Sequence, residues 1–215
     1  MKLIYKGKFK GYDQLPIGDL PETAVKFNEP DSIEKVMEKA LVFSLLAFIP
    51  IVVVFLLSIG LHQRVVLNFD LLGFWIWTLI SIPALWVHEV LHAIFFGKNS
   101  KVEMYTALSK GALFVICTDP ISKARFIFLS LFPNIILGLV SLLVWLVLPF
   151  FGLNSTGLFV FAVIMLLGGG GDYMNVYNAA MQMPKGSMQQ LSGMHSYWFM
   201  PGDIKTAPLT KGADN

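Results

Sequence analysis

Three residues in one apolar stretch have types and spacing suited to metal chemistry. His88, Glu89 and His92 form an H-E-x-x-H sequence within the apolar segment 71–96. Residues four apart lie on one face of a helix, so both imidazoles can reach a single tetrahedral zinc ion. Glu89 lies about 100° around the helix from His88, where its carboxylate can take the proton of a water held by the metal. The pattern predicts His88 and His92 as zinc ligands and Glu89 as a catalytic base.

The alternative for this motif is structural, with two core histidines and one buried acid satisfied by their neighbours. A charge at the centre of a membrane helix costs about 3 kcal/mol on insertion scales, and ionisable groups in such helices are mostly functional. That cost favours metal binding.

The composition indicates the class of protein. Of 215 residues, 55% are apolar and only 14% are charged, whereas soluble domains carry about 25% charged residues. We therefore predict a mainly α, polytopic membrane protein whose surroundings are the lipid bilayer. A net charge of +2 is too small to indicate a nucleic-acid partner. The single cysteine, Cys117, excludes an internal disulfide and a cysteine-rich zinc site, and the first 40 residues lack the apolar core of a cleavable signal peptide.

Apolar runs and turn signals divide the chain. Residues 1–40 are expected to be a cytosolic segment of extended strands or loops that ends in a short amphipathic helix, with Asp31 as N-cap and Glu34 completing a capping box. Residues 41–183 form the membrane domain, and residues 184–215 a cytosolic, loop-rich tail. The four expected transmembrane helices are 41–61, 71–96, 126–151 and 157–183.

Residues 98–120, between the second and third transmembrane helices, predict a cytosolic β-hairpin around Ser109-Lys110-Gly111. The hairpin is either a simple connection or a strand whose open edge pairs with an extended substrate.

Lysine and arginine set the expected orientation. Residues 1–40, 97–125 and the tail hold fifteen of the sixteen basic residues, and the connections 62–70 and 152–156 hold only Arg64. The positive-inside rule then places both termini and the hairpin in the cytoplasm. Because His62 lies in one of these outer connections, it is expected to be an interfacial loop residue rather than a ligand.

A catalytic zinc with two histidines and water needs a third protein ligand. Asp172 is the one acidic residue in a predicted span other than that of the motif, and it follows four glycines, 168–171, that permit close helix approach or break the helix. At the rise per residue of an α-helix, His88 and Asp172 are expected at similar depths in the membrane, about 26 Å and about 22 Å from its outer boundary. Asn175, one turn on, is the expected hydrogen-bond partner of Asp172. Three rivals for the third position remain, namely Glu103, Asp119 and His195.

These residues resemble a known family. The sequence is similar to the bacterial "putative zincin peptidase" family of membrane proteins, itself similar to site-2 intramembrane metalloproteases. The similarity lies in the H-E-x-x-H motif on a membrane helix, the later Asp172, and a tail with Met-Pro-Lys-Gly (183–186) and Gly193-Met194-His195. The resemblance implies zinc held by His88, His92 and Asp172, with Glu89 as base, in a bacterial cytoplasmic membrane. Asp172 is followed by Tyr173, where site-2 proteases usually have glycine.

Together, these features predict a zinc metallopeptidase that cleaves protein or peptide substrates at or near the cytoplasmic membrane face. One alternative is a non-catalytic zinc-binding sensor or assembly protein. Another is a metal-ion carrier, which the scarcity of polar residues in the spans disfavours.

Overall fold

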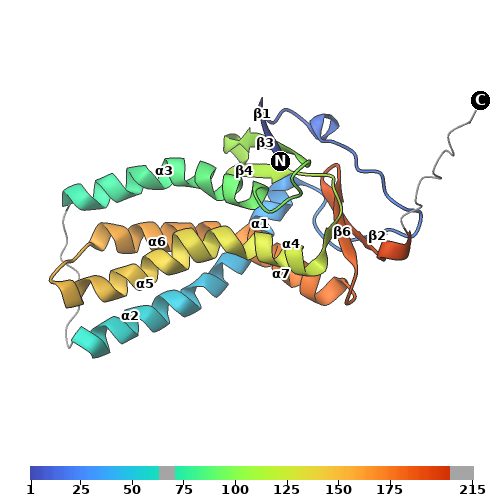
Figure 1. The fold of residues 1–215 in the computed structure, drawn as a ribbon. Helices are drawn as coiled ribbons and strands as arrows, with labels where there is room; N and C mark the ends of the chain where they lie inside the picture. Colours follow the sequence, from blue (N-terminus) through green and yellow to red (C-terminus); the bar gives the residue numbers. More distant parts are fainter. Residues whose placement is uncertain (63–70, 204–215) are drawn as a thin grey trace, which may run out of the picture.

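The computed structural model describes residues 1–62 and 71–203 and separates the chain into a helical end and a β-rich end. Long helices run side by side, and the β-strands gather at one end of them (Figure 1). Arg64 and the part of the tail after residue 203, both used in the prediction of orientation, lie outside the described residues.

Three helical segments are long and apolar enough to cross a membrane, and a bent pair adds a fourth if it counts as one span. This finding fits a membrane protein, as the composition predicted. The first segment joins α1 (Ile33–Ser44), a short 3-10 turn (Leu45–Ala47) and α2 (Phe48–His62). The second is α3 (Leu71–Ala93). The third joins α4 (Lys123–Pro133), a π-helical segment (Asn134–Leu139), α5 (Val140–Val147) and a 3-10 turn (Leu148–Phe151). The bent pair is α6 (Thr156–Gly168) and α7 (Gly170–Gln182), which meet at 43°.

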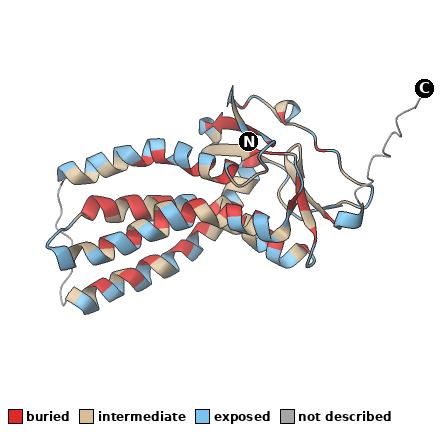
Figure 2. Cartoon of the chain, in the orientation of Figure 1, coloured by how far each residue is buried: buried red, intermediate tan, exposed pale blue. Residues whose placement is uncertain are grey.

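Helix α6 is the centre of the helical end. It packs against α3 on one side and α5 on the other, and α2 packs against α5. Its buried face is formed chiefly by Leu158, Phe161, Ala162, Met165 and Leu166. The outer faces of α2 and α3 are largely exposed (Figure 2), as expected for apolar surfaces that face lipid.

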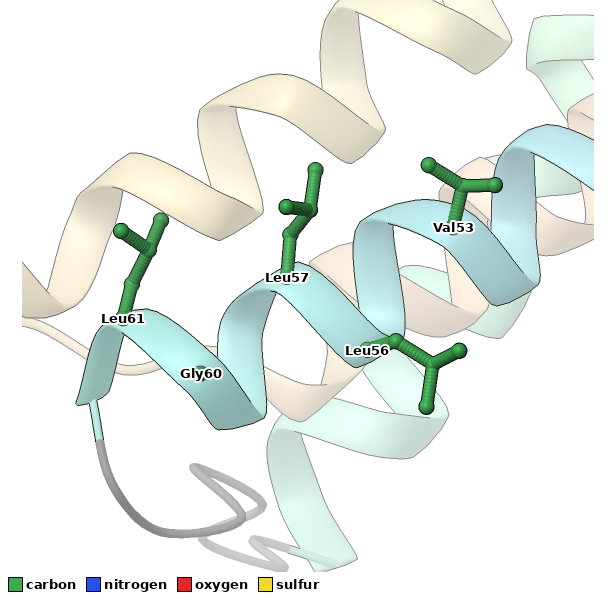
Figure 3. Close-up of a pocket in the computed structure, with 5 residues that line it drawn as sticks. All are labelled: Val53, Leu56, Leu57, Gly60 and Leu61. Atoms are coloured by element: carbon green, nitrogen blue, oxygen red, sulfur yellow. The ribbon is translucent and has the colours of Figure 1, made fainter.

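A shallow apolar groove of about 500 Å³ lies on the outer half of α2. Figure 3 shows Val53, Leu57 and Leu61 following one another along one side of the helix, with Leu56 pointing the other way. The residues that line it offer no polar side chain for chemistry, so we assign this groove to the lipid-facing surface.

The strands form two small sheets that mix the N-terminal, middle and C-terminal parts of the chain. In the first, β1 (Lys2–Lys8) pairs in parallel with β3 (Lys101–Ala107), which pairs antiparallel with β4 (Ala112–Ile116). The second has the order β2 (Val25–Lys26), β7 (His195–Phe199), β6 (Met188–Ser192), β5 (Ile121–Ser122) and is antiparallel throughout. Short 3-10 turns lie at Tyr12–Gln14, Leu108–Lys110 and Pro201–Asp203.

The predicted hairpin is present, with Gly111 in the left-handed conformation (φ 69°) at its turn. The pairing of β1 along β3 was not predicted. The tail is not loop-rich, because residues 188–199 form the β6–β7 hairpin around Gly193 (φ 59°).

Two local predictions were wrong. Ser32, not Asp31, caps α1, since its hydroxyl accepts a hydrogen bond from the Lys35 N–H. His62 is the last residue of α2 rather than a loop residue, and its Nε2 lies 3.1 Å from the Leu146 carbonyl oxygen of α5. That bond ties the ends of two neighbouring helices together.

The crossing of α3 and α6 gives a stability prediction. A Cβ added at Gly157 would lie 2.3 Å from Trp77 Cδ1 and 2.6 Å from the Gly73 carbonyl oxygen, whereas one at Gly60 would meet nothing within 4 Å. We expect Gly157→Ala to lower stability by about 1–3 kcal/mol through overpacking. The control, Gly60→Ala, should be neutral or slightly stabilising. Thermal unfolding of the purified variants measures both, and equal effects would contradict the close crossing.

Candidate metal centre

Helix α3 presents the motif on its buried face. His88, Glu89 and His92 are 7%, 9% and 7% exposed, respectively. The two imidazoles lie one turn apart with ring centroids 4.8 Å from each other. The helical spacing predicted from the sequence is therefore realised, with the reactive side chains turned towards the protein rather than the lipid.

Asp172, in the first turn of α7, reaches both histidines. Its Oδ2 lies 3.0 Å from His88 Nε2, and its Oδ1 lies 3.1 Å from His92 Nε2. One carboxylate on α7 thus meets two side chains of α3, of which His88 is 84 residues away in sequence.

These three side chains fit a zinc ion. One ligand atom from each can be chosen so that all three lie within 4.8 Å of one another. Ligands about 2.0–2.1 Å from a tetrahedral zinc lie about 3.3 Å apart, which is close to the observed separations. Two imidazole nitrogens and one carboxylate also form a common donor set of catalytic zinc sites that leave one position open.

The carbonyl of Leu129 in α4 orients His92. His92 Nδ1 lies 2.7 Å from that oxygen, and a carbonyl can only accept, so Nδ1 carries the proton. The lone pair of Nε2 is then free to bind a metal.

Asn134 holds the carboxylate from the other side. Its Nδ2 donates to Asp172 Oδ2 at 2.7 Å and to the Ser130 carbonyl at 3.3 Å. Tyr173, which follows the aspartate, donates its hydroxyl hydrogen to the Leu166 carbonyl at 2.8 Å and lies 3.4 Å from Asn134 Oδ1. Asn134, which is 2% exposed, begins the π-helical segment, a feature that often marks functional sites.

The prediction that Asn175 would support Asp172 is replaced by this finding. Among the described residues, Asn134 is the side chain that donates an amide hydrogen to Asp172. One signal in the sequence could have identified it, because a buried asparagine inside an apolar span requires a polar partner. Leu129 has no such signal, since it acts through its backbone.

The glycines before Asp172 have both roles that were considered. A Cβ at Gly169 would lie 1.8 Å from Asn134 Oδ1, and one at Gly170 would lie 2.2 Å from the Ala40 carbonyl oxygen. The same glycines separate α6 from α7. They therefore let α1 and α4 approach closely and also turn Asp172 towards α3.

Glu89 lies under the first sheet. Its carboxylate faces the backbone N–H of Val115 in β4. In the antiparallel ladder Val115 stands opposite Met104 of β3, and β4 is an edge strand. The outer edge of β4 thus faces the motif helix.

The three rival ligands lie elsewhere. Glu103 is buried in the first sheet, with Lys101 Nζ at 2.6 Å and the Tyr105 hydroxyl at 2.6 Å. His195 approaches Glu29 and Asp31, each at 3.7 Å. Within residues 1–62 and 71–203, the group that could hold a metal ion consists of His88, His92 and Asp172, without Asp119.

A comparison with protein families gives a match for this chain. The family described as "Putative zincin peptidase" matches residues 81–188. The chain belongs to this family. The matched range includes His88, Glu89, His92, Asn134 and Asp172. The description of the family implies zinc and suggests a metallopeptidase. Neither the curated proteins nor the solved structures contain a match to this chain.

The arrangement predicts a graded loss of metal. Purified wild-type protein should hold about one zinc per chain, and His88→Ala or His92→Ala should abolish retention because two ligands cannot hold the ion. Asp172→Ala should weaken it strongly. Metal content by mass spectrometry after dialysis against a chelator measures each step, and a wild type that cannot take up zinc would contradict the assignment.

A second prediction separates the two asparagines. Asn134→Ala should weaken zinc affinity by about 10–100-fold, because residues that orient a ligand have effects of that size. Asn175→Ala, on the same helix as Asp172, is the matched control and should change affinity little. Competition with a fluorescent chelator measures both, and equal losses would remove the role given to Asn134.

Proposed function

We propose that this protein is a zinc-dependent endopeptidase that hydrolyses peptide bonds at or near the cytoplasmic face of a bacterial membrane. The observation that carries the proposal is the convergence of His88, His92 and Asp172 beside the buried Glu89, at the end of an apolar helix. Membership of a family described as zincin peptidases supports the same activity. Similarity to site-2 proteases stays a prediction.

His88, His92 and Asp172 would hold the metal in this proposal. Zinc, when bound, polarises a substrate carbonyl and lowers the pKa of a water. Glu89 takes the proton of the attacking water and then delivers it to the nitrogen of the leaving amine. The Val115 N–H, which faces the Glu89 carboxylate, would help to orient it towards the metal ligands.

The outer edge of β4 suggests how a substrate is held. In an antiparallel ladder, alternate residues direct their backbone groups towards opposite neighbours. Val115 points its N–H towards Glu89 rather than towards β3, so Leu113, two residues earlier, directs its N–H and C=O the same way. An extended peptide that pairs with this edge would pass beside Glu89. We therefore propose a protein or peptide segment in extended conformation as the substrate.

Orientation in the membrane follows from the basic residues of the sequence. Both termini and the β3–β4 hairpin are proposed to be cytoplasmic, with the turn before α6 outside. The site, at the end of α3 that leads into the strands (Figure 1), then lies towards the cytoplasmic face.

The test of activity is Glu89→Gln. We expect hydrolysis to fall by a factor of about 10²–10⁴, because general acid–base catalysis contributes that much, while zinc content stays near that of the wild type. The readout is a comparison of membrane proteomes from cells with either protein, followed by cleavage of the identified substrate by purified protein. Unchanged proteomes and no cleavage by zinc-loaded wild type would instead support the non-catalytic zinc-binding alternative.

The test of orientation uses single cysteine probes. A membrane-impermeant thiol reagent applied outside the cell should label a cysteine at Asn154 but not one at Lys110. The native Cys117 is 2% exposed, so background labelling should be low. The reverse pattern would place the candidate metal centre towards the opposite face.

A further inference from the structure

His195, part of a tail motif that the metal centre does not use, lies beside a buried carboxyl group. Glu29 follows β2, and its side chain is 9% exposed. The Glu29 Oε1 accepts the Ser196 N–H at 2.6 Å and lies 3.7 Å from His195 Nδ1. Within the described part of the chain, that buried ring nitrogen has no hydrogen-bond partner.

This contact joins segments that lead to the metal centre. The Phe27 N–H donates to the Ser196 carbonyl, so both backbone groups of Ser196 bind residues 27–29. Next to them, the Asn28 N–H donates to Gln182, the last residue of α7. Four residues after Glu29, α1 begins, and α1 packs against α7, which carries Asp172.

We propose that Glu29 and His195 form a proton-operated clasp, closed while Glu29 holds a proton and loosened when it ionises. The neutral carboxyl group of Glu29 can be buried against β7 with little loss of solvation free energy. The ionised form is a buried charge whose hydrogen-bond donors both belong to Ser196, because 3.7 Å is too long for a bond to His195 Nδ1. Residues 27–29 relieve this cost by separating from β7 towards water.

The surroundings place the transition near neutral pH. Burial raises the pKa of Glu29 to about 7, against the opposing effects of Ser196 and of Lys26 and Lys39. Burial also lowers the pKa of His195, with Lys26 lowering it further and Asp31 opposing the shift. The charged groups around the pair are Lys26 near β2, Asp31 before α1, and Lys35 and Lys39 on α1.

Glu29 and His195 have opposite effects on the stability of the closed clasp as pH changes. A carboxyl whose pKa is higher in the folded state than its ordinary value of 4.5 stabilises the closed clasp most at low pH. That contribution declines as pH rises from 4.5 and is lost above about 7. The His195 contribution has the opposite sign, since an imidazole with a lowered pKa destabilises the closed form only as pH falls below its ordinary value.

The test measures amide hydrogen exchange at Ser196 in purified full-length protein, with Glu29→Gln compared with wild type at each pH. The ratio cancels the intrinsic pH dependence of exchange. At about pH 8.5 we expect the wild-type amide to exchange roughly a hundredfold faster than that of Glu29→Gln, and at about pH 4 within about twofold. A ratio that is the same at both values would overturn the proposal.

Two further variants make the result specific. Asp31→Asn changes the exposed carboxylate near the other ring nitrogen of His195, so it should keep the wild-type pH dependence. His195→Asn replaces the neighbouring imidazole with a smaller side chain and lessens the burial that raises the pKa of Glu29, so the transition should move to lower pH. Loss of the pH dependence in Asp31→Asn, or its persistence in Glu29→Gln, would assign the effect to another group. The measurement needs no peptidase activity, so it is independent of the proposed function.

Discussion

Asp172 lies between two imidazoles where α3, α4 and α7 meet, and the architecture of the helical end follows from the need to satisfy it. An ionised carboxylate placed among apolar helices is costly unless charged or hydrogen-bonding groups surround it. Here both oxygens are within 3.1 Å of a histidine nitrogen, and one also accepts the Asn134 amide. Three helices must converge to supply those groups, so the polar cluster fixes their mutual positions as well as the chemistry.

Close approach at this point depends on the absence of side chains. Gly169 makes room for the amide of Asn134, and Gly170 makes room for the backbone of α1 at Ala40. The Ser44 hydroxyl, one turn further along α1, donates to the Leu167 carbonyl at 2.7 Å. This bond satisfies a backbone acceptor at the end of α6, where the helix breaks. The position of Asp172 and the packing of α1 against the other helices therefore both depend on the break between α6 and α7.

The β-rich end is continuous with the site rather than appended to it. In the first sheet, the Val115 N–H faces the carboxylate of Glu89. In the second, β5 leads directly into α4, whose first turn is capped by Ser122. Helix α4 then supplies the Leu129 carbonyl to His92. A few residues of backbone thus connect each sheet to a group in the candidate metal centre.

Much of the helical end could be predicted from sequence because its signals are local. The spacing of His88 and His92 places both on one face of any helix, and long apolar runs identify the membrane segments without knowledge of their partners. Asp172 could be selected because an acidic residue in an apolar span is rare and its depth matched that of His88. Asn134, the pairing of β1 with β3 and the β6–β7 hairpin depend on contacts between distant segments, which no local pattern specifies. The tertiary structure decided that Asn134 rather than Asn175 supports the carboxylate, because the side chain that faces Asp172 is set by how α4 crosses α7.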